Sequence, residues 1–300
     1  MILQATVGNE QAGMRLDDSL KALFPQLSKT EIRRLLDWGS CTVNQALVRV
    51  ASRTVHKGDA IALGLIEKER CIELAYAASD LLYEDQDCLA VNKGVGINSQ
   101  RTPYQLKGTV EYAVECYLHS LKIMEPARVV HRLDRGTSGV LFFPKKKQAA
   151  THIAAEFKAG HVEKIYWAIV AGRAVKESWK VDAPIGKLNK FRYGVISGGK
   201  ESVTEFRVIA RGSDATLVEA RPLTGRTHQI RVHLAHGGLP IIGDTAYGGP
   251  PAVRILLHCR HMAFRGPHGQ AVSADAPVDE AFRDLCTANG IIADLNETVG

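Results

Sequence analysis

The stretch HRLDRGTSG, residues 131–139, places one carboxylate between two arginines and then continues with four small residues. Asp134 lies two residues after Arg132 and one residue before Arg135. These neighbouring cations favour the ionised carboxylate, which suits a nucleophile or a base better than a proton donor. An arginine–aspartate pair in a loop is also a common structural ion pair. The local pattern therefore leaves a catalytic and a structural interpretation open.

Composition places the chain among ordinary globular proteins. Its 300 residues are 45% apolar, which is enough to bury the core of one large domain or of two domains of unequal size. The sequence contains no run of about 18 apolar residues, and its beginning lacks the basic and apolar regions of a signal peptide. Its six cysteines include no close pair that would suit zinc or redox chemistry. We expect a soluble cytoplasmic protein with reduced thiols and no membrane association.

Positive charge is concentrated near the N-terminus. The whole chain carries a formal net charge of +6, with a sequence pI of about 9.0. Between Arg15 and Lys57 there are eight lysines and arginines and four acids, so this segment alone has a net charge of 8 − 4 = +4. Such a basic segment is compatible with a polyanionic partner.

The same segment shows the pattern of a small α/β module. Leucines at helical spacing predict a helix that ends at Pro25. The sequence SKTE, from Ser28, is a capping-box pattern and predicts a second helix that ends at Gly39. Alternating apolar and polar residues between 41 and 63 predict short strands joined by tight turns.

These features resemble the alpha-L RNA-binding domain that was first described in a small-subunit ribosomal protein. The resemblance covers residues 13–64 and rests on the order Arg15-Leu16-Asp17, Ser28-Lys29, Gly39, Val43-Asn44 and Gly58-Asp59. It implies that three residues on the polar face of the second helix contact RNA phosphates: Lys29, Arg33 and Arg34. The spacing of these residues alone favours the interpretation as a solvated face of an amphipathic helix, and the resemblance outweighs it.

The remaining sequence alternates predicted strands and helices. Residues 80–100 predict two strands followed by a glycine-rich bend, which matches no phosphate-binding loop motif. Helices are predicted over 108–121, over 148–160 with an end at Gly160, and, as a short segment, over 228–236. The apolar run at 164–172 predicts a central strand, and further strands are predicted at 204–210 and 216–223. Asp244 follows Gly243 and is interpreted as a structural turn residue.

Four blocks in a fixed order closely resemble the RNA pseudouridine synthases of the RluA/RluD group: HRLDRGTSG, EKIYWAIVAG, RPLTGRTHQIRVHLAHGGLPIIGDTAYGG and LLHCRHMAF. The resemblance implies an α+β catalytic domain over residues 80–300, with a mixed, mainly antiparallel sheet, flanking helices and a central RNA cleft. A small α/β RNA-binding domain (13–64) and a linker (65–79) would precede it. The implied activity is the isomerisation of uridine to pseudouridine in RNA.

The resemblance also implies roles for individual residues. Asp134 matches the catalytic aspartate, which attacks the target uridine at the anomeric carbon of its ribose. Tyr166 matches the tyrosine that stacks on the flipped base and is a candidate for helping to remove the carbon-5 proton. Arg231 matches the arginine that pairs with the aspartate. Arg132 matches a position whose side chain enters the RNA and helps to displace the target nucleotide. Two further assignments complete the predicted site. Arg226 is assigned to RNA binding, and Leu257 is assigned as an apolar residue that packs beneath the active site.

The expected chemistry agrees with these residue types. A base must leave the RNA stack before its glycosidic bond can be reached, and a stacking aromatic ring offsets part of that cost. The isomerisation involves no net redox change and adds no group, so neither a metal nor an organic cofactor is expected. One departure from the family pattern is Lys93-Gly94, where relatives usually have Lys-Pro. Because this change affects a loop that could meet RNA, it leaves the choice of target open.

Alternative functions follow from the same residues. A non-catalytic RNA-binding or ribosome-assembly factor would not need Asp134, Tyr166 and Arg231 together. A glycoside or nucleoside hydrolase would normally need two well-placed carboxylates, and only Asp134 is a credible candidate. The N-terminal module favours large-subunit ribosomal RNA as the substrate, with transfer RNA as the alternative. We expect the protein to act as a monomer.

Overall fold

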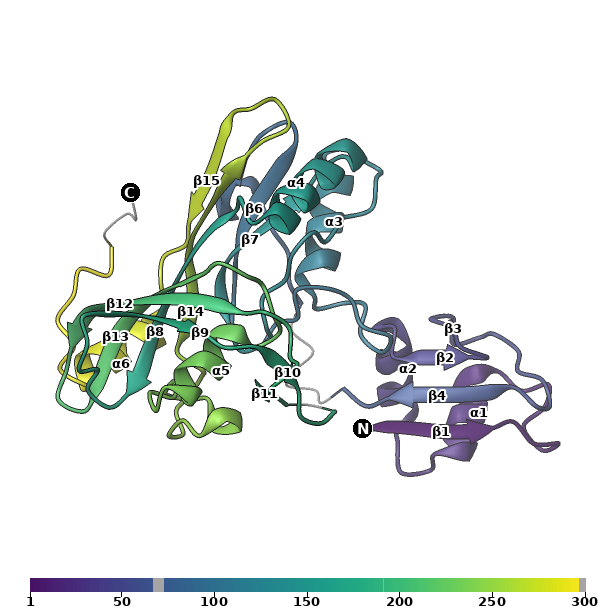
Figure 1. Ribbon diagram of the computed structural model, residues 1–300. Helices are drawn as coiled ribbons and strands as arrows, with labels where there is room; N and C mark the ends of the chain where they lie inside the picture. Colours follow the sequence, from purple (N-terminus) through teal and green to yellow (C-terminus); the bar gives the residue numbers. More distant parts are fainter. Residues whose placement is uncertain (67–72, 191, 297–300) are drawn as a thin grey trace. The chain divides into compact units, whose positions relative to one another are not determined.

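Apolar strands between residues 81 and 275 form a nine-stranded sheet in the computed structural model (Figure 1). Their order is β5-β6-β7-β14-β8-β13-β12-β9, and β15 pairs with β14. Among the described strands of this sheet, only β7 and β14 pair in parallel. The prediction of a mixed, mainly antiparallel sheet is confirmed. The strands are β5 (Leu81–Glu84), β6 (Cys88–Lys93), β7 (Ser138–Pro144), β8 (Glu163–Ala171), β9 (Ser178–Asp182), β12 (Val203–Arg211), β13 (Ala215–Pro222), β14 (Leu257–Arg265) and β15 (Ala271–Asp275).

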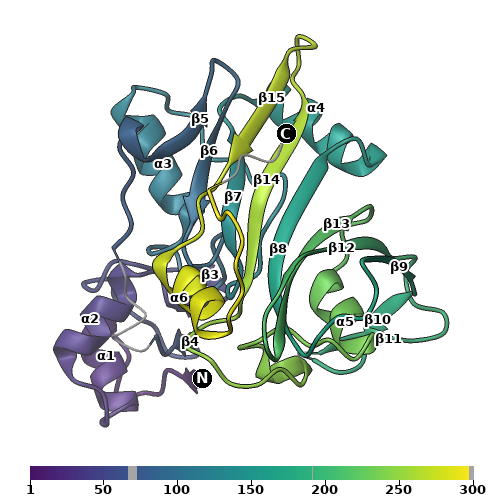
Figure 2. The same ribbon diagram turned by 90° about the vertical axis from the view of Figure 1, so that its left-hand side faces the viewer.

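Three helices accompany this sheet. α4 (Lys147–Ala159) ends at Gly160, which has the left-handed conformation that was predicted for a helix stop. α5 (Gln229–His236) confirms the predicted short helix and contacts β12 and β13 (Figure 2). α6 (Glu280–Ala288) contributes Phe282 to the core that strands β8 and β13 share. These helices bury apolar side chains that the sheet would otherwise expose to water.

Strand β8 lies between β14 and β13 in the interior of the sheet. This position confirms the central strand that its apolar sequence predicted. Residues 167–170 of this strand are all buried. A separate hairpin of β10 (Ile185–Lys187) and β11 (Tyr193–Val195) follows β9. Tyr166 lies on β8, and Asp134 lies in the turn before β7.

The N-terminal residues form a second, smaller sheet with the order β1-β4-β2-β3. Its strands are β1 (Ile2–Thr6), β4 (Ala60–Gly64), β2 (Cys41–Val43) and β3 (Ala46–Leu47), and they share a core with α1 (Leu16–Leu23) and α2 (Lys29–Asp37). The hydroxyl of Ser28 accepts a hydrogen bond from the amide of Glu31 at 3.1 Å, as the capping pattern predicted. Asn44 and Gln45 both have positive φ, which closes the tight turn between β2 and β3.

The described residues, 1–66, 73–190 and 192–296, divide into two compact units. One comprises Met1–Tyr76 with Asn98–Ala127, and the other Ala77–Ile97 with Arg128–Gly300. These units differ from the domain boundaries expected from sequence, and part of the expected linker at 65–79 lies outside the described residues. In particular, the segment that contains α3 (Val110–Ser120) belongs to the N-terminal unit.

Hydrogen bonds explain why this segment belongs there. The hydroxyl of Ser40 donates to the carbonyl oxygen of Tyr104 at 2.8 Å, and the amide of Leu106 donates to the carbonyl of Trp38 at 2.8 Å. The N-terminal unit also begins before residue 13, where the expected domain started, because β1 pairs with β4 along its whole length. Among residues 1–66, 73–190 and 192–296, none of the helices has the length and hydrophobicity that a membrane span requires.

Candidate active site

Asp134 lies in a turn that leads directly into strand β7. The amide of Thr137 donates a hydrogen bond to the carbonyl oxygen of Asp134 at 3.0 Å, which closes the turn. The side chain of Asp134 is 22% exposed and lines a cavity of about 650 Å³. The loop 130–134, strand β8, residues 222–231 and strand β14 supply most of the cavity wall. This volume is in the range of pockets that hold a small ligand.

Arg231 is in direct contact with Asp134. Its Nη1 donates to Asp134 Oδ2 at 3.2 Å, and the guanidinium makes two further bonds to Asp244, from Nε at 2.7 Å and from Nη2 at 2.9 Å. Asp244 is 1% exposed, so this second pair is shielded from water. The ion pairs with both carboxylates raise the pKa of Arg231, although burial opposes the shift. Asp244 therefore holds the arginine in the orientation in which it meets Asp134.

The arginines adjacent in sequence play a different part. Arg135 donates from Nε to the carbonyl of Gly96 at 2.8 Å, and Arg132 is exposed and lines the cavity. The hydrogen bond between Arg231 and Asp134, 97 residues apart in the sequence, is the pairing that the family resemblance implied. The fold brings together Asp134, in the turn before β7, and Arg231, on α5.

His228 is a further neighbour of Asp134. Its Nε2 lies 3.6 Å from Asp134 Oδ2, and its Nδ1 lies 2.7 Å from the hydroxyl oxygen of Tyr247. His228 precedes α5 with φ of 58°, a left-handed conformation that is uncommon for a residue other than glycine. Burial lowers the pKa of His228, so the ring is neutral near pH 7. Its position in THQIR, three residues before Arg231, was a sequence signal that could have indicated it.

Tyr166 lines the same cavity from strand β8. Burial raises the pKa of its phenol well above the usual range, and the adjacent Cys259 and Asp134 act in the same direction. The phenol therefore stays protonated, and it can offer an aromatic face and a hydroxyl group but not a phenolate. Lys164, two residues earlier on the strand, also lines the cavity, and burial lowers its pKa.

The remaining predicted residues of this unit also lie at the cavity. Arg226 is exposed, and its Nε donates to the carbonyl of Glu201 at 2.9 Å. Leu257 is 3% exposed and contributes an apolar part of the wall. The structure thus gathers all six predicted residues of the catalytic unit around one cavity: Arg132, Asp134, Tyr166, Arg226, Arg231 and Leu257.

The three predicted RNA contacts of the N-terminal unit lie on α2 and bond within their own unit. Lys29 forms an ion pair with Asp18, and Arg33 forms one with the buried Asp17 at 2.8 Å. Arg34 donates to the carbonyl of Ile66 at 3.1 Å. Lys29 and Arg33 remain about half exposed, so their charges are accessible to a polyanion. Their role in RNA binding stays a prediction.

Lys93 is a buried cation that the sequence reasoning did not include in the site. It is fully buried, and its Nζ donates to the carbonyls of Gly94 at 2.9 Å and Ile97 at 2.8 Å. A longer contact, 3.4 Å, joins Lys93 Nζ to the carbonyl of Arg135 in the loop that carries Asp134. Burial lowers the pKa of Lys93 to about 7, and the charge of Asp134 partly opposes this shift. Within the described residues, no group of three or more histidines, cysteines and acids is arranged to hold a metal ion.

Comparisons with known proteins agree with this geometry. Residues 87–236 match the RNA pseudouridylate synthase family. The chain is 33% identical over 294 residues to the "Uncharacterized RNA pseudouridine synthase YlyB" of Bacillus subtilis, covering 94% of this chain and 96% of that protein. It is 32% identical to the "Ribosomal large subunit pseudouridine synthase D" of Pseudomonas aeruginosa, covering 93% and 92%. Among solved structures, "Human RNA Pseudouridylate Synthase Domain Containing 1" is 25% identical with a TM-score of 0.60, covering 73% of this chain and 92% of that one.

Proposed function

Because the chain belongs to the RNA pseudouridylate synthase family, we propose that it isomerises uridines of large-subunit ribosomal RNA with Asp134 as the nucleophile. Membership of the family makes the protein an isomerase that acts on RNA. The observation that carries the assignment of Asp134 is its contact with Arg231 at the wall of the cavity. A carboxylate held by a fixed guanidinium is ready to attack an electrophilic carbon.

In the proposed reaction, the Asp134 carboxylate attacks carbon 1′ of the ribose, and the bond from carbon 1′ to N1 breaks. The uracil leaves with the bonding electron pair and rotates within the cavity. Its carbon 5 then forms a bond to carbon 1′ and releases the carboxylate. The proton on carbon 5 is lost and N1 gains one, so atoms and charge balance. Tyr166 supplies a ring against which the base can stack.

Target access would depend on base flipping. The uridine must leave its stack to enter the cavity, and the exposed Arg132 stands at the cavity wall beside Asp134. An inserted cationic side chain can take the place of the displaced base and contact nearby phosphates. We assign this role to Arg132, and we assign phosphate contacts to Arg226.

The choice of ribosomal RNA rests on the relatives. Proteins named "Ribosomal large subunit pseudouridine synthase D" are 29% to 32% identical to this chain over most of its length. The N-terminal unit would add affinity through the exposed charges of Lys29 and Arg33 on α2. Ribosomal RNA is met in the cytoplasm, which is where we place the reaction.

Substitution of Asp134 by asparagine tests the proposal. The asparagine keeps the size of the side chain and removes the nucleophilic charge, so RNA binding should stay within about threefold while pseudouridine formation falls by at least about 10⁴-fold. The assay follows tritium release from transcribed large-subunit ribosomal RNA that carries uridine labelled at carbon 5. Asp214→Asn, an exposed aspartate in the loop between β12 and β13, is the matched control and should be fully active. Activity in Asp134→Asn would refute the nucleophile.

The target is tested separately by mapping pseudouridines in cells with and without the gene, through carbodiimide-blocked reverse transcription. Loss of a modification from large-subunit ribosomal RNA would support the proposed substrate. Loss confined to transfer RNA would overturn the choice of RNA while leaving the reaction intact.

The contribution of the N-terminal unit is tested by Lys29→Gln. If Lys29 contacts a phosphate, the slope of log affinity against log salt concentration should become shallower by about 0.7 to 0.9. An unchanged slope would remove Lys29 from the RNA interface.

A further inference from the structure

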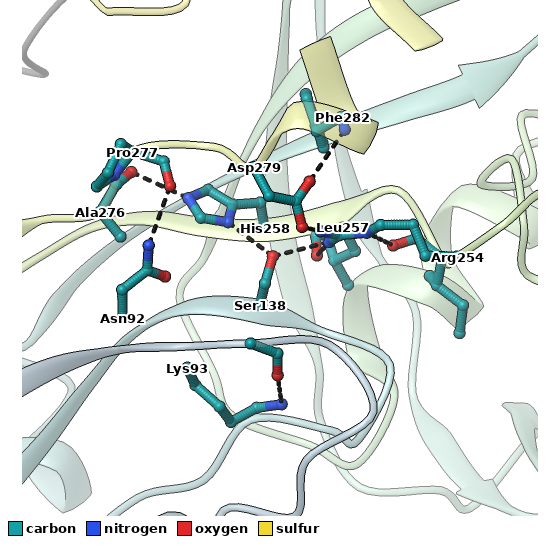
Figure 3. Close-up of polar contacts among 12 residues, drawn as sticks. Asn92, Lys93, Ser138, Arg254, Leu257, His258, Ala276, Pro277, Asp279 and Phe282 are labelled. Atoms are coloured by element: carbon teal, nitrogen blue, oxygen red, sulfur yellow. Dashed lines mark hydrogen bonds and ion pairs between the residues drawn. The ribbon is translucent and has the colours of Figure 1, made fainter. Parts of the chain in front are cut away.

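Ser138, four residues after Asp134, is part of a buried hydrogen-bond network that the proposed reaction does not use (Figure 3). The residue begins β7 and is 3% exposed. Its hydroxyl oxygen lies 2.7 Å from Nη2 of Arg254 and 2.8 Å from Nδ1 of His258. Arg254 and His258 are themselves buried. Burying polar groups lowers the stability of the fold unless they are fully hydrogen-bonded. A buried network of this kind therefore needs a structural or functional explanation.

The register of the sheet brings Ser138 to this network. β7 and β14 pair in parallel, and their register places Ser138 opposite His258 and Gly139 opposite Cys259. At Gly139, φ is +114°, and a Cβ atom would come within 2.1 Å of the carbonyl oxygen of Cys259. The absence of a side chain at Gly139 therefore permits the close approach of the two strands. This approach aligns the end of the nucleophile loop with the strand that carries Leu257.

The hydrogen positions in the network follow from its acceptors. His258 Nε2 lies 3.0 Å from the carbonyl oxygen of Ala276, which can only accept, so Nε2 carries a proton. Burial lowers the pKa of His258 to about 4, so the ring is neutral near pH 7 and its Nδ1 accepts. The Ser138 hydroxyl must then donate to His258 and accept from Arg254. The result is a directed chain from Arg254 through Ser138 and His258 to Ala276.

All three guanidinium nitrogens of Arg254 are bonded. Nε donates to the carbonyl of Ile255 at 3.0 Å, and Nη2 donates to the carbonyl of Leu257 at 3.2 Å in addition to Ser138. Nη1 forms an ion pair with Oδ2 of Asp279. This arginine is therefore held rigidly, with a single orientation toward Ser138.

Asp279 joins the network to the beginning of α6. Its Oδ1 accepts a hydrogen bond from the amide of Phe282 at 2.9 Å and caps the helix, while its Oδ2 faces Arg254. The two oxygens thus have separate tasks. Asn92 adds a second tie to the same segment, because its side-chain nitrogen donates to the carbonyl of Pro277 at 3.1 Å. Figure 3 shows these contacts around Ser138.

We propose that Arg254 is a positioning residue for the nucleophile, which it holds in place through Ser138 and the turn that ends at Thr137. Asp279 in turn holds Arg254, so the C-terminal helix contributes to the geometry of a site that it does not line. The turn is short, because the Thr137 amide bonds the Asp134 carbonyl, and a shift of Ser138 moves the carboxylate. This inference rests on the proposed role of Asp134.

The test is Asp279→Asn, which keeps an oxygen to cap α6 and removes the charge that holds Arg254. The control is Asp275→Asn, since Asp275 of β15 also pairs with a buried arginine of the same sheet, Arg260, at 3.4 Å. Tritium release from the labelled ribosomal transcript gives kcat and KM, with wild type and Asp134→Asn as references. We expect kcat of Asp279→Asn to fall about tenfold or more with KM within about twofold, because small misplacements of a reacting group are costly. The control should keep the wild-type kcat.

A second variant makes the result independent of the acid. Ser138→Ala removes the hydroxyl that Arg254 holds and should lower kcat to a similar extent. If both act through one network, the double variant Ser138→Ala/Asp279→Asn should be no slower than about the slower single variant. Multiplied losses in the double variant would overturn the proposal, because they would show independent effects.

Two results would overturn the positioning role of Arg254 while leaving the proposed nucleophile in place. One is a wild-type kcat for Asp279→Asn while Asp134→Asn is inactive, which would leave the nucleophile assignment standing. The other is an equal loss of kcat in Asp275→Asn, which would indicate a general effect of weakened packing. Activity in Asp134→Asn itself would overturn both this inference and the proposed nucleophile.

Discussion

Asp244→Asn is expected to weaken both the stability and the activity of the protein, because Asp244 holds Arg231. The carboxylate accepts bonds at 2.7 and 2.9 Å from this arginine and is 1% exposed. Removing one partner of a buried ion pair typically costs about 3 to 5 kcal/mol of unfolding free energy. The attraction of Arg231 to Asp134 and to the ring of Tyr247, 4.9 Å away, would offset part of this cost. We therefore expect the lower end, about 3 kcal/mol.

Activity should fall for a separate reason. An asparagine presents one acceptor oxygen and one NH₂ group, so it cannot accept one bond from Arg231 at each end of the side chain, as the two oxygens of Asp244 do. The guanidinium would then be free to tilt, and the orientation of Asp134 would change with it. A displacement of about 1 Å at a reacting group can lower the rate by about 10²-fold. We expect kcat to drop about 10- to 100-fold, with a smaller change in KM.

The assay combines urea unfolding with tritium release from labelled ribosomal transcript. Glu219→Gln is the matched control, since Glu219 is a buried acid that pairs with Arg207 and Arg221 and does not line the cavity. It should lose stability but keep the wild-type kcat. If the unfolding free energy of Asp244→Asn were within about 1 kcal/mol of the wild-type value and the variant kept full kcat, the argument that Asp244 fixes Arg231 would be refuted.

Three other substitutions have clear expected outcomes. Tyr166→Phe keeps the ring and removes the hydroxyl; RNA affinity should be retained, and a kcat equal to wild type would exclude any proton transfer through this group. Gly139→Ala should cost about 3 kcal/mol or more in urea unfolding, because its Cβ would meet the carbonyl of Cys259, and a variant of wild-type stability would contradict the strand register. His258 has a folded-state pKa of about 4, below its ordinary 6.5, so only the unfolded chain takes up a proton in this interval. The contribution of His258 to stability should be constant above pH 6.5 and decrease toward pH 4, and His258→Gln should flatten the dependence of stability on pH in this interval by up to about 1.4 kcal/mol per pH unit; equal slopes in the variant and the wild type would refute this assignment.

Elements with a strong local signal could be predicted from the sequence. β8 has a nearly continuous apolar run, and α4 stops at Gly160 because a left-handed residue ends the helix. The capping pattern at Ser28 likewise marks the start of α2. In each case the decisive interactions lie within a few residues along the chain, so a local pattern carries the information.

Long-range pairing could not be predicted in this way. The parallel register of β7 and β14 joins residues 138–139 to 258–259, and no local periodicity specifies that partner. Asp244 does lie in a turn, since the amide of Gly249 bonds its main-chain carbonyl. The prediction that its side chain serves only this turn was wrong, because the carboxylate bonds Arg231 on α5, 13 residues earlier. A turn pattern indicates backbone bonds but does not indicate where the carboxylate points.

The position of Asp134 is explained better by the anchoring of its loop than by the charges beside it in the sequence. On one side, His131 accepts a hydrogen bond from the amide of Phe142 at 2.9 Å, and burial lowers its pKa to about 3, so it stays a neutral acceptor. On the other side, Ser138 is held by Arg254 at 2.7 Å. Both anchors tie the loop to the sheet, and the sheet also carries Tyr166. A nucleophile held from both ends needs little reorganisation when the substrate arrives, which is how a rigid fold lowers a reaction barrier. The motif HRLDRGTSG therefore combines the proposed nucleophile with residues that fix its position.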